Sequence, residues 1–237
     1  QSRILLRDSI CYLKKRACLP TVLLGLALLD ASTLHANPLA NPGFESGAQG
    51  RVSDWVWFGN AYREPVNARN GAHALKLFGN WSGPWNTSFV LQNLPASPGQ
   101  HWTVSGHAKH VAGDTLQGGN YSLLKVSWFD GPDGTGNMIQ PLPGTGALFG
   151  DYPGVESPPV DSGSAPDLWH RLSLSAIAPQ GTVSAQVLVI FVQPADQAGA
   201  AWFDDLEAEV VPAGQYGQFT YRVVEGAIEI TDYPETE

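Results

Sequence analysis

Apolar residues in this chain gather into short runs that are separated by turn-forming residues. Clusters rich in Pro, Gly, Asn and Asp, such as Pro95–Gly99 and Asp130–Gly136, lie between the runs. No window keeps the 3.6-residue period of an amphipathic helix. The pattern therefore predicts an all-β fold built as an antiparallel sandwich or barrel. The predicted strands are His73–Phe78, Ser88–Leu94, His101–Lys109, Tyr121–Phe129, Leu168–Ala176, Thr182–Val192 and Ala201–Val211.

Alternation along two of these runs predicts which side chains share a face. In His101–Lys109 the residues of one side are Trp102, Val104, Gly106 and Ala108, and those of the other are His101, Thr103, Ser105, His107 and Lys109. In Ala201–Val211 the predicted apolar row is Trp202, Leu206, Ala208 and Val210, with Asp204 in the same row. An unpaired buried carboxylate is costly, so Asp204 indicates a bound cation.

The chain is expected to divide into three parts. Residues 1–36 combine basic residues, an apolar run from Ala17 to Leu29 and a small-residue exit at Ala36, which is typical of a secretory signal peptide. The run is shorter than the roughly 20 apolar residues of a membrane span, although an uncleaved N-terminal anchor is an alternative. Residues 37–212 form the predicted sandwich, with a long loop at about 131–166. Residues 213–237 carry a predicted hairpin and are either a tail or the start of a further domain.

Removal of residues 1–36 changes both charge and cysteine content. The formal net charge of the whole chain is −9. The segment holds five basic and two acidic residues, so the remainder carries −12. Such an acidic surface repels phosphate backbones, which makes nucleic acid a poor partner. Cys11 and Cys18 both lie in the removed segment, so the predicted exported domain contains no disulfide.

Several short motifs occur in an order that resembles a known family. They are Asn41-Pro42-Gly43-Phe44-Glu45, Gly71–Leu77, Val90-Leu91-Gln92, Pro98–Ser105, Asp167-Leu168-Trp169 and Ala201–Leu206. Together they resemble family 4/9/22-type carbohydrate-binding modules of the galactose-binding-like jelly-roll superfamily. The resemblance implies a non-catalytic jelly roll that binds a poly- or oligosaccharide within a larger secreted or cell-surface protein. The segment Tyr221–Thr231 resembles the lead-in to a bacterial surface leucine-rich-repeat region.

The resemblance also implies a structural calcium ion. Its ligands would be Glu45 and one of Asp204 and Asp205, together with backbone carbonyls. Calcium binds several hard oxygens, which carboxylates from distant parts of a chain can supply. The alternative is that Glu45 is a surface charge and the Asp pair caps a turn.

Aromatic and planar polar side chains are the candidates for sugar contact, because sugars present C–H faces and hydroxyls. Trp81 and Trp85 lie in a breaker-rich loop and form either a ligand platform or a loop that packs on itself. Trp55 and Trp57 share a strand face, so at least one is expected in the core. The polar row around His107, joined by Gln92, lines a groove or is an ordinary solvated face. The predicted ligand residues are Trp81, Trp85, Trp57, Gln92 and His107.

No enzymatic motif accompanies these residues. A glycosidase needs two carboxylates that flank a cleft, and the acidic residues here match no such motif. The histidines lack the H-E-x-x-H spacing of zinc proteases, and no G-x-S-x-G or phosphate-binding loop is present. A sugar-binding module is therefore the first hypothesis. A structural or adhesive jelly-roll domain without sugar binding is the second, and a lyase on a jelly roll is the third.

Overall fold

A computed structural model of the chain describes residues 36–80, 85–141 and 152–214, and the strands within 220–224 and 227–232. The described residues form antiparallel strands and a single 3-10 turn, η1 (Pro132–Gly134), without an α-helix. The all-β prediction is confirmed. None of the described residues belongs to a helix that is long and apolar enough to cross a membrane.

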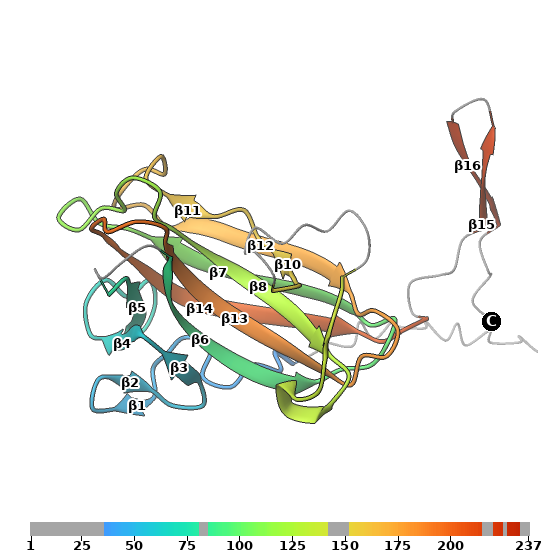
Figure 1. Cartoon of the computed structure of the whole chain (residues 1–237), viewed down its shortest axis with the longest axis horizontal. Coiled ribbons are helices and arrows are strands. Elements are labelled where there is room, and N and C mark those ends of the chain that lie inside the picture. Colours follow the sequence, from blue (N-terminus) through green and yellow to red (C-terminus); the bar gives the residue numbers. More distant parts are fainter. Residues whose placement is uncertain (1–35, 81–84, 142–151, 215–219, 225–226, 233–237) are drawn as a thin grey trace, which may run out of the picture. The chain divides into compact units, whose positions relative to one another are not determined.

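Two antiparallel sheets make up the sandwich (Figure 1). Sheet B has the order β10-β8-β13-β6-β3, and β9 and β11 also pair with β8. Its strands are β3 (Val56–Phe58), β6 (Asn86–Pro95), β8 (Tyr121–Phe129), β9 (Met138–Ile139), β10 (Val155–Glu156), β11 (Val160–Asp161) and β13 (Ser184–Gln193). Sheet C has the order β12-β7-β14-β5-β4. Its strands are β4 (Asn60–Glu64), β5 (Ala74–Phe78), β7 (His101–Lys109), β12 (His170–Ile177) and β14 (Ala200–Val211).

The main core lies between the two sheets. Trp102 of β7 and Trp128 of β8 meet there edge to face, with ring centroids 5.7 Å apart and planes at 77°. Both indoles are almost fully buried, as their places in the strand pattern predict. Trp202 is also buried, and of Trp55 and Trp57, at least one of which is expected in the core, Trp55 is the buried one. Edge-to-face contact suits two aromatic quadrupoles, so this pair ties one sheet to the other.

Strand β14 departs from the predicted side-chain pattern at a bulge. Its pairing with β7 shifts register between Asp204 and Glu207, and Asp205 has a left-handed φ of 51°. The extra residue changes which side chains face inward. Leu206 therefore joins the main core, whereas Trp202 belongs to a separate small cluster on the outer face of sheet C. The prediction of one continuous row from Trp202 to Val210 was wrong, because alternation cannot anticipate a bulge.

The remaining strands are short. The long loop predicted at 131–166 contributes β9, β10 and β11, all of which pair with β8. Strands β1 (Gly47–Ala48) and β2 (Arg51–Val52) form a small hairpin near the start of the described chain. Strands β15 (Thr220–Val224) and β16 (Ala227–Asp232) form the hairpin predicted in residues 213–237.

Candidate functional site

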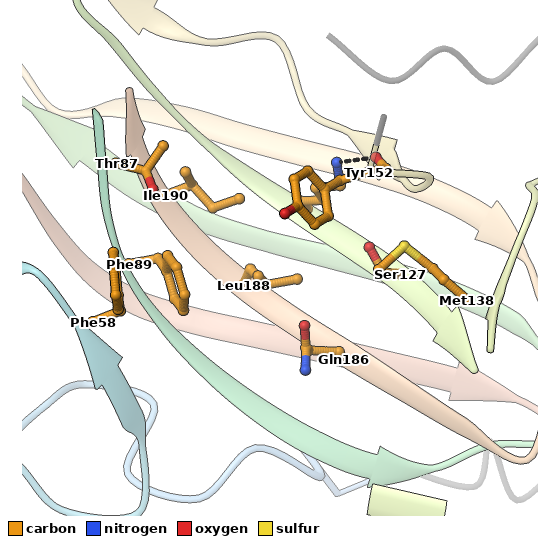
Figure 2. A pocket seen from close by; sticks show the side chains of 10 residues that line it. Phe58, Thr87, Phe89, Ser127, Met138, Tyr152, Gln186, Leu188 and Ile190 are labelled. Atoms are coloured by element: carbon orange, nitrogen blue, oxygen red, sulfur yellow. Dashed lines mark hydrogen bonds between the residues drawn. The ribbon is translucent and has the colours of Figure 1, made fainter. Parts of the chain in front are cut away.

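A cleft of about 360 Å³ opens on the outer face of sheet B. That volume lies within the range of small-ligand sites. Strands β3, β6, β8 and β13 supply most of its walls and floor, and Met138 of β9 and Tyr152 before β10 complete it (Figure 2). The lining residues are Phe58, Thr87, Phe89, Lys125, Ser127, Met138, Tyr152, Gln186, Leu188 and Ile190.

The floor of the cleft follows from strand register. In β13 the side chains of Val187, Val189 and Phe191 enter the main core, so Gln186, Leu188 and Ile190 face outward. Leu188 pairs with Leu91 of β6 and Lys125 of β8, while Ile190 pairs with Phe89 and Leu123. The centre of this outer face is therefore apolar. Polar residues lie at the two ends, where Gln186 pairs with Ser127 and where Thr87 lies beyond Ile190.

Aromatic rings form two opposite walls. Phe58 stacks on Phe89, with centroids 5.1 Å apart and planes at 18°. Tyr152, which is 61% exposed, lies on the opposite side, and Leu188 and Ile190 lie between these walls (Figure 2). Flat aromatic faces on both sides of a cleft suit a ligand that has its own apolar faces.

The charged group of the cleft is neutralised by a buried partner. Lys125 Nζ lies 3.0 Å from Glu156 Oε1, and the two side chains are only 3% and 2% exposed. Lys125 also donates a 2.7 Å hydrogen bond to the carbonyl of Tyr152 (Figure 2). The pair therefore anchors β10 and the segment that carries the Tyr152 ring. The described lining residues include no carboxylate.

A tight turn holds Met138 at the rim of the cleft. Asn137 donates from its backbone N–H to Asp130 Oδ1 at 2.6 Å and from its side-chain amide to Asp130 Oδ2 at 3.0 Å. These bonds lower the pKa of the Asp130 carboxyl, and the side-chain bond has the larger effect. The carboxyl therefore stays ionised at neutral pH. The turn directly precedes Met138, so it fixes where that side chain begins.

Of the tryptophans predicted as ligand residues, Trp85 and Trp57 are not among the lining residues. Trp85 is 67% exposed and has a left-handed φ of 56°, immediately before β6. Trp81 lies outside the described residues. Trp57 is 47% exposed and is the Cα partner of Val90, so it lies on the other side of β3 from Phe58. The guanidinium of Arg51 stacks on the Trp57 ring with its central carbon 3.7 Å from the centroid.

Gln92 and His107, the other predicted ligand residues, lie on different sheets. Gln92 is buried on the inner side of β6. Its Oε1 accepts a 3.0 Å hydrogen bond from the backbone N–H of Ala40, and its Nε2 donates a 2.6 Å hydrogen bond to the Ala40 carbonyl. His107 lies in the outward polar row of β7, on sheet C. Burial and the charge of Arg69 lower the pKa of His107, which favours the neutral ring. The structure therefore does not bring Gln92, His107 and Trp57 together at the cleft.

The carboxylates predicted to bind calcium hold one loop. Glu45 accepts hydrogen bonds from the backbone N–H groups of Ala72 and His73, and Asp204 accepts from those of Arg69 and Asn70. Glu45 Oε2 forms a hydrogen bond with Nδ1 of the His73 ring, and Asp204 Oδ1 accepts a hydrogen bond from the backbone N–H of Asp205. Asp205 pairs with Arg69. Calcium binds oxygen atoms, and the carboxylate oxygens here already accept hydrogen bonds from N–H groups. A calcium ion at this place would therefore have to displace those N–H groups from the carboxylates.

The titration of these two carboxyls reflects their surroundings. Burial raises the pKa of Asp204, against the opposing effect of its N–H donors. Burial alone would also raise the pKa of Glu45, but hydrogen bonds from His73 and Ala72 outweigh it and lower that pKa. Among the described residues, no group of three or more His, Cys, Asp or Glu side chains is placed to hold a metal.

The sequence prediction missed the residues that line the cleft, although a signal was present. Runs such as Val187–Val192 and Phe89–Leu91 are apolar on both faces. An antiparallel strand with one solvated face normally alternates between apolar and polar residues. Continuous apolar runs therefore indicate a covered or ligand-binding outer face, which is where Phe89, Leu188 and Ile190 lie.

Neither a family model nor a curated protein sequence matches the chain. Solved structures with a similar fold include a CBM61 module in complex with beta-1,4-galactotriose. It is 20% identical with a TM-score of 0.46, over 74% of this chain and 99% of that module. The C-terminal family 22 carbohydrate-binding module of Clostridium thermocellum Xyn10B is 18% identical with a TM-score of 0.46, over 71% of this chain and 90% of the module.

A third similar structure is the enzymatically active domain of tailspike protein 4 from bacteriophage CBA120. It is 12% identical with a TM-score of 0.48, and the match covers 74% of this chain but only 21% of the tailspike chain.

Proposed function

We propose that this chain is a non-catalytic carbohydrate-binding domain and that the cleft of sheet B is its binding site. The observation that carries the proposal is the stacked pair Phe58–Phe89, which faces Tyr152 across an apolar floor. Sugar rings offer C–H faces to such walls, while Gln186 and Ser127 offer polar groups at one end. The resemblance of the sequence to carbohydrate-binding modules supports the same function.

The composition of the cleft also supports a binding role without catalysis. Glycoside hydrolysis requires two carboxylates on either side of the scissile bond. The described lining residues offer none, and the nearby Glu156 is already paired with Lys125. We further propose that the domain is exported and belongs to a larger secreted or cell-surface protein, as its signal-like N-terminal segment and its resemblance imply.

The test is to screen the full chain against a panel of neutral and acidic oligosaccharides, with calorimetry on every hit. We expect saturable binding to neutral glycans and no release of reducing sugar or unsaturated product. If the folded protein binds no glycan in the panel, a structural or adhesive role is favoured instead. Turnover that disappears on replacing one carboxylate would contradict the non-catalytic assignment.

A structural calcium ion stays a separate prediction. Its support is that Glu45 and Asp204 hold neighbouring residues of one loop and both approach Gly43. A Cβ at Gly43 would lie 3.7 Å from Asp204 Oδ1 and 3.9 Å from Glu45 Cγ. If the two carboxylates share an ion, a chelator lowers the thermal midpoint and added calcium restores it. An unchanged midpoint in excess chelator would mean that N–H donors alone hold the loop.

A further inference from the structure

The floor of the cleft is unsuited to hydroxyl groups. Leu188 and Ile190 are 8% and 5% exposed, and both line the cleft. Their strand neighbours on the same face include Leu91 and Phe89. None of these four side chains can donate or accept a hydrogen bond. A sugar hydroxyl placed against them would therefore lose its water without gaining a partner, which is unfavourable.

The two polar side chains at the Gln186 end of the cleft already make hydrogen bonds within the protein. Gln186 donates to Asn93 Oδ1 at 3.0 Å, and Ser127 donates to the carbonyl of Pro153 at 2.7 Å. They retain some hydrogen-bonding capacity toward a ligand, but only near that end. A ligand that spans the cleft thus meets polar groups at the ends, including Thr87 beyond Ile190, and the apolar side chains of Leu188 and Ile190 at the centre.

The charge of the cleft argues for a neutral ligand. Lys125 is the cation of the lining, and its partner Glu156 lies 3.0 Å away and is equally buried. The pair contributes no net charge at neutral pH. An acidic sugar would meet no uncompensated cation among the described lining residues, whereas a neutral sugar would lose no charge hydration on entering.

We infer that the cleft prefers neutral glycans that present a methyl group, either of an O-acetyl substituent or of a 6-deoxy sugar, with the methyl group on Leu188 and Ile190. This inference rests on the proposed function of the cleft. Acetylation removes a hydroxyl donor that the floor cannot satisfy and adds a methyl group that the floor can bury, whereas a 6-deoxy sugar lacks the hydroxyl altogether. Each buried methylene strengthens binding by about fourfold.

The experiment compares each neutral oligosaccharide of the panel as the free sugar and in O-acetylated form. Calorimetric titration of the full chain should show the acetylated form binding at least about fourfold more tightly than its free counterpart. The affinity should change little between low and high salt, because no net charge is involved. Equal or weaker binding of the acetylated forms would overturn the inference while leaving the proposed function intact. Absence of binding by both forms would overturn both.

A variant of the floor links the preference to its cause. In Leu188→Thr a hydroxyl replaces part of the apolar surface, so the advantage of the acetylated ligand should shrink. Ile177→Thr serves as the matched control, because Ile177 is 48% exposed on β12 of the other sheet. A preference that is unchanged in a folded Leu188→Thr protein would overturn the placement of the substituent. If that variant does not fold, the comparison of ligands on the parent chain still decides the preference.

Discussion

Phe58 of β3 lies against Phe89 of β6 with the two ring planes only 18° apart. The preceding residue, Trp57, turns to the other side of the strand and stacks on Arg51. Neighbouring aromatic residues of one short edge strand thus have different surroundings. The Phe ring forms a cleft wall, whereas the indole joins a cation–π contact beyond the cleft. Residue type alone does not distinguish these two environments, but strand parity does.

The buried ion pair beneath the cleft should be costly to break. Replacing Lys125 with Met leaves Glu156 buried without its charged partner, so we expect a loss of about 3–5 kcal/mol in the free energy of unfolding. Urea denaturation of the two proteins measures this difference. The double variant Lys125→Met/Glu156→Gln should recover part of the loss, because it removes both charges. If the double variant is no more stable than the single one, charge burial is not the cause.

The core tryptophans and the exposed one should respond differently to truncation. Trp128→Ala removes a fully buried indole that packs on Trp102, so a loss of about 3–5 kcal/mol is expected. Trp85→Ala removes a side chain that is 67% exposed, and its effect should stay within about 0.5 kcal/mol. Thermal or urea unfolding compares the two. A large loss at Trp85 would assign that ring to packing.

The backbone at Trp85 offers a sharper test of the predicted ligand platform. Its left-handed φ of 56° costs a non-glycine residue about 1 kcal/mol, which glycine avoids. Trp85→Gly should therefore unfold at no lower urea concentration than Trp85→Ala. If glycan affinity also falls, the strained position is retained for binding. Unchanged affinity in both variants would remove Trp85 from the ligand site.

The pH dependence of stability should report on Asp204. Burial raises the pKa of Asp204 above that of the same carboxyl in the unfolded chain. At a pH between the two pKa values, the folded state therefore binds a proton that the unfolded state has lost. The resulting stabilisation is present below the unfolded pKa, about 3.9, and is lost as the pH rises through the folded pKa. In chelator, we compare the thermal midpoints of the parent and of Asp204→Asn at increasing pH. The parent midpoint minus the variant midpoint should fall as the pH rises above the unfolded pKa. A difference that rises with pH would show a lowered pKa instead.

Much of the sandwich could be predicted from local sequence. Strands β7 and β8 match the predicted ranges His101–Lys109 and Tyr121–Phe129, because alternation and turn residues are local signals. The bulge after Asp204 could not be predicted, since one extra residue leaves no mark on composition. The shortest strands, such as β1 and β9, were also missed. Two residues are too few to show a period.

The site was harder to predict because it depends on contacts between distant segments. Phe58, Phe89, Leu188 and Tyr152 meet only after β3, β6 and β13 pair and residues 152–153 bind to β8. The sequence interpretation chose two tryptophans in a loop, together with aromatic and polar residues on other strand faces. Gln92 illustrates the difficulty, because its amide binds a backbone segment more than fifty residues away.

Truncating the aromatic wall tests whether the cleft binds sugar. Phe58→Ala and Phe89→Ala should each weaken glycan affinity by about 1–3 kcal/mol, by analogy with the loss of an aromatic anchor. Phe58 is 55% exposed, so its removal should change stability little. Ile177→Ala is the matched control, with 48% exposure on sheet C and no place in the cleft lining.

The most direct measurement is the dissociation constant of the best neutral oligosaccharide for the parent chain, Phe58→Ala and Ile177→Ala, measured by calorimetry on folded protein. Sugar binding in the cleft of sheet B predicts that Phe58→Ala raises the constant about fivefold or more while Ile177→Ala leaves it unchanged. The same constant for all three proteins would contradict the assignment of the cleft as the binding site.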